Sequence, residues 1–134
     1  GPYRNKPATK KYEHYEFKNN TTAGSSCMQG WRKTMEDAEI TMPHFVIPNH
    51  DKPHSLFAVF DGHGGHAVAR LCAKLLPDYI RKQPCLQLVD KTGKQQLTQE
   101  NVQEALTTAF VELDRWLNSV EGRGEVRKLC EEGN

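Results

Sequence analysis

The sequence predicts an α+β fold, and two observations lead to this prediction. Short apolar or alternating segments occur within the first sixty residues, and two long segments with helical spacing follow them. Strands that precede helices in this way are typical of α+β domains. The length of 134 residues suits one domain or part of one.

Four segments are predicted as strands. Residues 12–18 alternate aromatic and polar side chains and suit an edge strand. Residues 23–29 and 38–46 are further candidates. Residues 56–60 form a short, continuous apolar run, which indicates a buried strand. Residues 1–11 are basic and rich in turn-forming residues, so we expect an extended N-terminal arm there.

The first predicted helix spans about residues 65–81. Apolar residues recur in it at spacings of three and four, namely Val68, Leu71, Cys72, Leu75 and Tyr79. Pro77 lies inside this segment and lacks a backbone donor, so a kink or a break is expected there. A loop over 82–97 follows, with a short strand considered at 86–89.

The second predicted helix spans about residues 99–120. Thr98 suits the N-cap, and Gly122 and Gly124 are expected to end the helix. The remaining residues, 122–134, are expected to be a polar tail, which we treat as a candidate for disorder. The apolar stripe of the helix comprises Val102, Leu106, Ala109 or Phe110, Leu113, Trp116 or Leu117, and Val120.

Composition argues against several classes of protein. The formal net charge of +1 offers no argument for binding nucleic acid or a charged membrane surface. No apolar run approaches the ~20 residues that a membrane-spanning helix needs, and no signal peptide is recognisable. Four cysteines without a Cys-x-x-Cys motif favour a reduced, intracellular protein, cytoplasmic or nuclear or both.

The first residues leave two interpretations open. Gly1-Pro2 fits a scar of protease cleavage, or a glycine exposed by removal of methionine. The second interpretation would invoke N-myristoylation, but Asn5 stands where that motif needs Ser or Thr.

The residues that carry candidate chemistry begin with Asp61, which ends the predicted strand 56–60. Open sheets commonly place ligands at the carboxyl ends of their strands. Gly62, Gly64 and Gly65 then allow backbone conformations or close approaches that other residues resist. A plain strand-to-helix turn with an aspartate cap is the other interpretation of this stretch.

Two acidic clusters, Glu36-Asp37 and Asp61, offer the carboxylates that Mg²⁺ and Mn²⁺ prefer. A site that holds two such ions can activate water for attack on a phosphoryl centre. Asp61 suits a bridging role because it ends a predicted strand, and Gly62 could lend its carbonyl. Arg32 offers a planar fork for phosphate oxygens. Histidine is a common general acid, so His63 could protonate a leaving alkoxide.

Two stretches together resemble the signature of the metal-dependent Ser/Thr protein phosphatases of type 2C. They are residues 26–38, Ser-Cys-Met-Gln-Gly-Trp-Arg-Lys-Thr-Met-Glu-Asp-Ala, and residues 57–65, Phe-Ala-Val-Phe-Asp-Gly-His-Gly-Gly. Their order and spacing both match, and the similarity extends from about Tyr12 to Trp116. The resemblance implies a β-sandwich of two antiparallel sheets flanked by helices, of which this chain would form a part.

The resemblance also implies an activity, which is the hydrolysis of phosphoserine and phosphothreonine in proteins with two Mn²⁺ or Mg²⁺ ions. Phosphorylated proteins would be the substrates. The implied roles are phosphate binding for Arg32, metal ligation for Asp37, Asp61 and the Gly62 carbonyl, metal ligation through water for Glu36, and general acid catalysis for His63. Trp31 and Met35 are interpreted as core residues.

The chain departs from the family pattern in two respects. Glu39 stands where the family usually has His, and we expect its side chain to lie outside the metal ligands. The family domain is about twice as long, and no motif for its later metal-binding aspartates follows Asp61. Residues 12–121 are therefore expected to be the N-terminal half of a catalytic domain. We expect the isolated chain to lack phosphatase activity and to associate with its missing half or with a swapped copy.

Two other functions stay open at this point. The chain could be a non-catalytic binding or regulatory module that keeps the phosphatase fold. Alternatively, Gly62-x-Gly64-x-x-Ala67 after a strand formally fits a dinucleotide fingerprint, although Asp61 would then repel a pyrophosphate. The spacing of His50 and His54 resembles that of metal ligands, but no third ligand is close in the sequence, which favours a polar loop.

Overall fold

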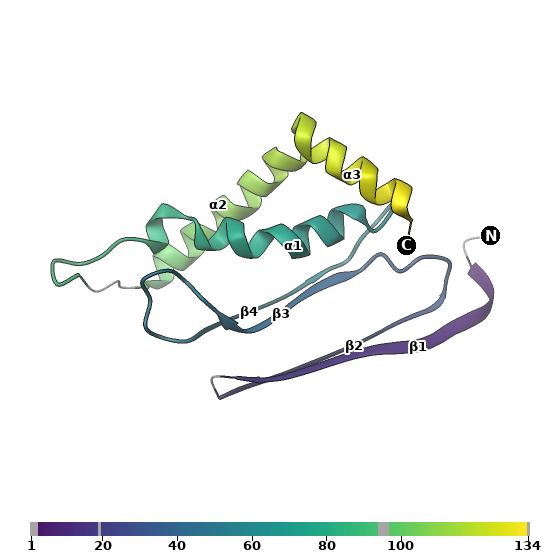
Figure 1. Ribbon diagram of the computed structural model, residues 1–134, viewed down its shortest axis with the longest axis horizontal. Helices are drawn as coiled ribbons and strands as arrows, with labels where there is room; N and C mark the ends of the chain where they lie inside the picture. The colour runs from purple at the N-terminus through teal and green to yellow at the C-terminus, as the bar shows by residue number, and fades with distance from the viewer. Residues whose placement is uncertain (1–2, 19, 94–96, 134) are drawn as a thin grey trace.

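The computed structural model describes residues 3–18, 20–93 and 97–133. Its elements confirm the predicted α+β class, and Figure 1 shows their arrangement. In chain order they are β1 (Tyr3–Lys18), β2 (Thr21–Arg32), β3 (Ala38–Phe45), β4 (His54–Phe60), α1 (Ala67–Arg81), the 3-10 helix η1 (Pro84–Leu86), α2 (Gln99–Leu117) and α3 (Val120–Glu132).

The strands form two antiparallel pairs, β1 with β2 and β3 with β4. Helices α1 and α2 lie over one side of the β3–β4 pair, and the β1–β2 pair lies on its other side (Figure 1). The Ser25 hydroxyl joins the two pairs by donating to Glu39 Oε1 at 2.6 Å. This layering agrees with the two antiparallel sheets and flanking helices that the family resemblance implied.

Strand β4 is not the buried strand that its apolar run predicted. Its residues alternate between half-buried and exposed, and Val59 is 77% exposed. Leu56, Ala58 and Phe60 pack against the hydrophobic core, whereas Phe57 and Val59 line the gap between the two strand pairs. The prediction was wrong because the helices cover only one face of β4.

The hydrophobic core lies between α1, α2 and the β3–β4 pair. Ala105 and Ala109 of α2 are 1% and 0% exposed, and such small side chains let two helices approach closely. Leu76 and Ile80 of α1 are also buried here, although the predicted stripe omitted both. The buried cluster comprises Ile40, Phe45, Ile47, Leu76, Ile80, Cys85, Leu86, Ala105, Ala109 and Leu113.

Helix α1 continues through Pro77 instead of breaking. Pro77 is buried, so tertiary packing holds the helix across the position where one backbone hydrogen bond is missing. The buried face is rotated from the predicted stripe: Leu71 is buried as expected, but Val68 is 47% exposed.

Helix α2 begins as predicted, because the Thr98 side chain accepts a hydrogen bond from the Asn101 N–H at 3.2 Å. It ends earlier than predicted, at Leu117. Val120, expected in its stripe, is 93% exposed and starts α3.

The polar tail expected from residue 122 is helical as far as Glu132. Ser119 caps α3 by accepting the Gly122 N–H at 3.1 Å. Gly122 does not stop a helix; it lets α3 pass close to the end of α2. A Cβ at this position would lie 2.1 Å from the Trp116 carbonyl oxygen.

Residues 3–11 likewise belong to a strand, β1, and not to a separate arm. The pairing register with β2 shifts between Tyr3 and Ala8 and again between Ala8 and Lys11. These irregularities, together with Pro7, explain why the segment lacks a strand pattern; proline is tolerated on a strand at the edge of a sheet. Gly1, Pro2, residues 94–96 and Asn134, on which parts of the predicted arm, loop and tail fall, lie outside the described residues.

Three further expectations have clear outcomes. The strand considered at 86–89 is replaced by η1 and a single bridging residue, Val89. Trp31 is 56% exposed and so is not a core residue. The four cysteines are free thiols.

Within the described ranges, no helix combines the length and apolar character that a membrane crossing requires.

The junction of α2 and α3 generates a stability prediction. Gly122→Ala should lower the free energy of unfolding by about 1–3 kcal/mol, because the new methyl group meets backbone that cannot move away cheaply. Gly124→Ala is the matched control in the same helix, since a Cβ there meets nothing within 4 Å. That change should raise the free energy of unfolding by about 0.5–1 kcal/mol. Urea unfolding curves measure both, and equal effects would contradict the steric argument.

Candidate active site

The candidate site is built at one end of the β3–β4 hairpin. The last ladder pair is Ala38 opposite Phe60. Asp37 immediately precedes this pair on one strand and Asp61 follows it on the other. Two carboxylates far apart in sequence therefore emerge at the same end of one hairpin.

A close backbone approach brings the two acidic loops together. A Cβ added at Gly62 would lie 2.2 Å from the Glu36 carbonyl oxygen, which no real side chain tolerates. Glycine at position 62 is therefore required by contact rather than by a positive φ angle. The next two glycines do need unusual angles, with φ of 72° at Gly64 and 124° at Gly65.

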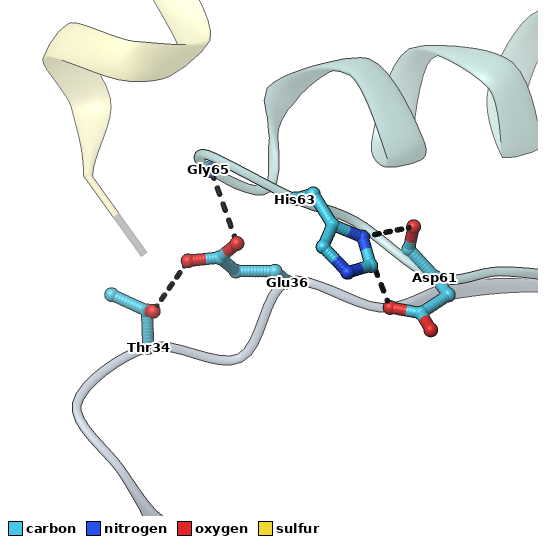
Figure 2. Close-up of polar contacts among 5 residues, drawn as sticks. All are labelled: Thr34, Glu36, Asp61, His63 and Gly65. Carbon is cyan, nitrogen blue, oxygen red and sulfur yellow. Dashed lines mark hydrogen bonds and ion pairs between the residues drawn. The ribbon is translucent and has the colours of Figure 1, made fainter. Parts of the chain in front are cut away.

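Glu36 joins the two loops through its side chain. Its carboxylate accepts a hydrogen bond from the Thr34 hydroxyl at 2.7 Å and another from the Gly65 N–H at 3.1 Å (Figure 2). These two donors, Thr34 first, hold the pKa of the Glu36 carboxyl below its ordinary value, and the nearby charges of Arg32 and His63 act in the same direction.

His63 lies beside Asp61 on the exposed side of the turn. Its Nδ1 is 3.3 Å from the Asp61 backbone carbonyl oxygen and 3.5 Å from Asp61 Oδ1 (Figure 2). Because a carbonyl oxygen only accepts, the first contact requires a proton on Nδ1. Both side chains are largely exposed, at 84% for His63 and 78% for Asp61.

One pocket of about 420 Å³ collects all six residues that the sequence singled out. Thr34 and Gly64 also line it; Gly65, which lies next in the chain, donates to Glu36. The sequence predicted no role for Thr34, although the Thr-x-Glu spacing indicates that its hydroxyl can reach the Glu36 carboxylate. For Gly65 it predicted only an unusual backbone conformation or a close approach. The pocket is lined by Met28, Gln29, Arg32, Thr34, Met35, Glu36, Asp37, Asp61, Gly62, His63 and Gly64.

Glu39 does not line this pocket. The Glu39 carboxylate accepts a hydrogen bond from the Ser25 hydroxyl, and Glu39 lines the gap between the two strand pairs.

The donor chemistry of the pocket suits a hard divalent cation. Carboxylate and carbonyl oxygens are the ligands that Mg²⁺ and Mn²⁺ prefer. Across the ranges 3–18, 20–93 and 97–133, however, no three His, Cys, Asp or Glu side chains form a group that could hold a metal ion. Both oxygens of Glu36 are already engaged by Thr34 and Gly65.

Comparisons with known proteins identify relatives of this chain. The chain is 44% identical to mouse and human "Protein phosphatase 1G" over 107 residues, which cover 80% of this chain and 17% of those proteins. It is 34% identical to human "Protein phosphatase 1B" over 120 residues, 89% of this chain and 25% of that protein. It is 35% identical to "Probable protein phosphatase 2C 21" of Arabidopsis thaliana over all 134 residues of this chain, which cover 33% of that protein.

The chain thus spans between about a sixth and a third of these curated relatives. The profile of one family, described as "Protein phosphatase 2C", matches residues 21–130, which include both acidic loops, α1, α2 and most of α3. This match covers most of the chain, and the chain therefore belongs to the protein phosphatase 2C family.

Proposed function

We propose that this chain forms the N-terminal part of the active site of a protein serine/threonine phosphatase, and that phosphorylated proteins are its substrates. The observation that supports the proposal most directly is the shared pocket. Arg32 from the end of β2 lines one polar cavity together with residues of two separate loops, namely Glu36, Asp37, Asp61, Gly62 and His63. Family membership and the printed names of the relatives support the same reaction class.

Asp37, Asp61 and the Gly62 carbonyl would hold the divalent metal, Mn²⁺ or Mg²⁺, and Glu36 would contribute through water. When bound, the metal supplies an activated water and stabilises charge on the phosphoryl group. The two aspartates flank the ladder pair of Ala38 and Phe60 and both line the pocket, so a cation bound there could contact both carboxylates. Residues beyond this chain would complete a two-ion site, since the described residues contain no full ligand group.

Arg32 and His63 would act on the substrate. The Arg32 guanidinium can bind two phosphate oxygens at once, which positions the phosphoryl group in the pocket. His63 directs Nδ1 toward Asp61, so Nε2 is the nitrogen that can deliver a proton to the leaving serine or threonine oxygen. Its exposure allows rapid exchange of that proton with solvent between turnovers.

A second candidate function is a regulatory or binding module that keeps the fold without catalysis. The incomplete ligand group among the described residues favours it. Divalent-ion binding distinguishes the two functions, because a non-catalytic module has no need to bind Mn²⁺ in this pocket. The dinucleotide-binding alternative is not supported, because its fingerprint belongs to a parallel βαβ unit and the strand pairs in the described residues are antiparallel.

The role of Asp61 is tested in the longest form of the protein that contains this chain. Asp61→Ala should reduce Mn²⁺-dependent hydrolysis of a phosphothreonine peptide by about 100-fold or more, because several kcal/mol of transition-state charge stabilisation are lost. Asp51→Ala is the matched control, since Asp51 is an exposed aspartate in the β3–β4 loop and does not line the pocket. Activity of Asp61→Ala within about tenfold of the unaltered protein would exclude the ligand role.

The role of His63 is tested by comparing two leaving groups. His63→Gln should slow hydrolysis of the phosphothreonine peptide by about 10²–10⁴-fold, because its alkoxide needs a proton. Hydrolysis of p-nitrophenyl phosphate should slow much less, because nitrophenolate leaves without one. His44→Gln on β3, outside the pocket residues, should leave both rates unchanged. Equal losses on the two substrates would indicate a structural role for His63.

A further inference from the structure

The start of α1 lacks the local capping that α2 and α3 have. Thr98 caps α2 and Ser119 caps α3, each with a side-chain hydrogen bond. The N-cap residue of α1, His66, makes no such bond, and the first turn of α1 contains no acidic residue. Exposed N–H groups and a partial positive charge at a helix start usually attract a negative group.

Glu36 supplies this negative group from another part of the chain. Its carboxylate accepts the Gly65 N–H, two residues before α1 begins, across 29 positions of sequence. The contact links the loop between β2 and β3 to the loop between β4 and α1. The second loop carries Asp61, Gly62 and His63.

The part of the second loop that follows Gly62 needs such a contact, because the glycines at 64 and 65 do little to restrict it. Glycine loses more conformational freedom on folding than any other residue. Gly64 and Gly65 adopt positive φ angles, and a Cβ at either meets nothing within 4 Å, so packing does not hold them. The hydrogen bond to Glu36 is the contact in Figure 2 that restrains Gly65.

Thr34 in turn orients Glu36. Its hydroxyl donates to Oε1 at 2.7 Å, while Oε2 accepts from Gly65 (Figure 2). A carboxylate tethered at one oxygen has fewer orientations open to it, so the other oxygen is held toward Gly65. Thr34 itself offers no carboxylate or imidazole to the pocket, and its contribution is made through Glu36.

We propose that Thr34 is a positioning residue of the pocket, because through Glu36 and Gly65 it fixes the loop that carries Asp61, Gly62 and His63. Its importance for catalysis rests on the proposed phosphatase function, whereas its effect on Gly65 does not. Glu36 then has a positioning role in addition to the water-mediated metal contact expected from the family motif.

The first test measures hydrogen exchange of the Gly65 amide in the 134-residue chain by NMR. Thr34→Val keeps the shape of the side chain but removes the hydroxyl, and it should speed exchange by about tenfold, as expected when one hydrogen bond to a charged group is lost. Thr34→Ser keeps the hydroxyl and should stay within about twofold. Glu36→Gln, which weakens the direct acceptor, should speed exchange at least as much as Thr34→Val.

Two controls separate this effect from general destabilisation. Thr107→Val, an exposed position on α2, should not alter exchange at Gly65. The amides of the β3–β4 ladder should exchange at unchanged rates in every variant. Unchanged exchange at Gly65 in Thr34→Val, or equal rates in Thr34→Val and Thr34→Ser, would overturn the proposal.

The second test uses the longest form of the protein and a phosphothreonine peptide. Thr34→Val should raise the Mn²⁺ concentration needed for half-maximal turnover by about fivefold or more, and Thr34→Ser should restore it. A merely structural role would lower thermal stability without this metal-dependent shift. If the unaltered protein has no activity, the phosphatase proposal fails, and exchange at Gly65 still decides the role of Thr34. If activity is present and exchange does not respond, the role of Thr34 fails alone.

Discussion

The close approach of Gly62 to the backbone of Glu36 is the constraint on which the candidate site depends. The Glu36 carbonyl oxygen occupies the space that any Cβ at position 62 would need. Because of this contact, two acidic loops separated by two strands share one cavity. The hairpin register places Asp37 and Asp61 next to the paired residues Ala38 and Phe60, and the carboxylate of Glu36 accepts the Gly65 N–H just before α1.

The layers of the fold explain why this end of the hairpin can be polar. The β3–β4 pair buries one face beneath α1 and α2, and the apolar side chains Ile40, Leu56 and Phe60 contribute there to the core. The strand ends, in contrast, lead into loops, where the carboxylates of Asp37 and Asp61 are exposed. A buried support therefore carries an open, charged site, an arrangement that suits the binding of a divalent cation.

Glycine has two distinct purposes in this chain. Gly62 and Gly122 permit contacts with backbone atoms of a neighbouring segment, and neither requires a positive φ angle. Gly64 and Gly65 have open space around them and instead adopt angles that other residues avoid. Both kinds occur in the loop before α1, which explains why that loop can follow a narrow path and why it also needs the external restraint provided by Glu36.

The sequence by itself determined the fold class, the starts of α1 and α2 to within two residues, and six of the residues that line the pocket. Those features depend on local signals: helical spacing, the Thr98 cap, and two motifs whose order and spacing match one family. The tertiary structure decided which faces are buried. Phe57 and Val59 of β4 and the side chain of Trp31 are exposed, and this exposure depends on how the layers pack, which the sequence does not reveal. It also decided that residues 122–132 are helical, because Gly122 fits against the end of α2. The link from Thr34 through Glu36 to Gly65 likewise needed the fold, since it joins residues that only folding brings within hydrogen-bond distance.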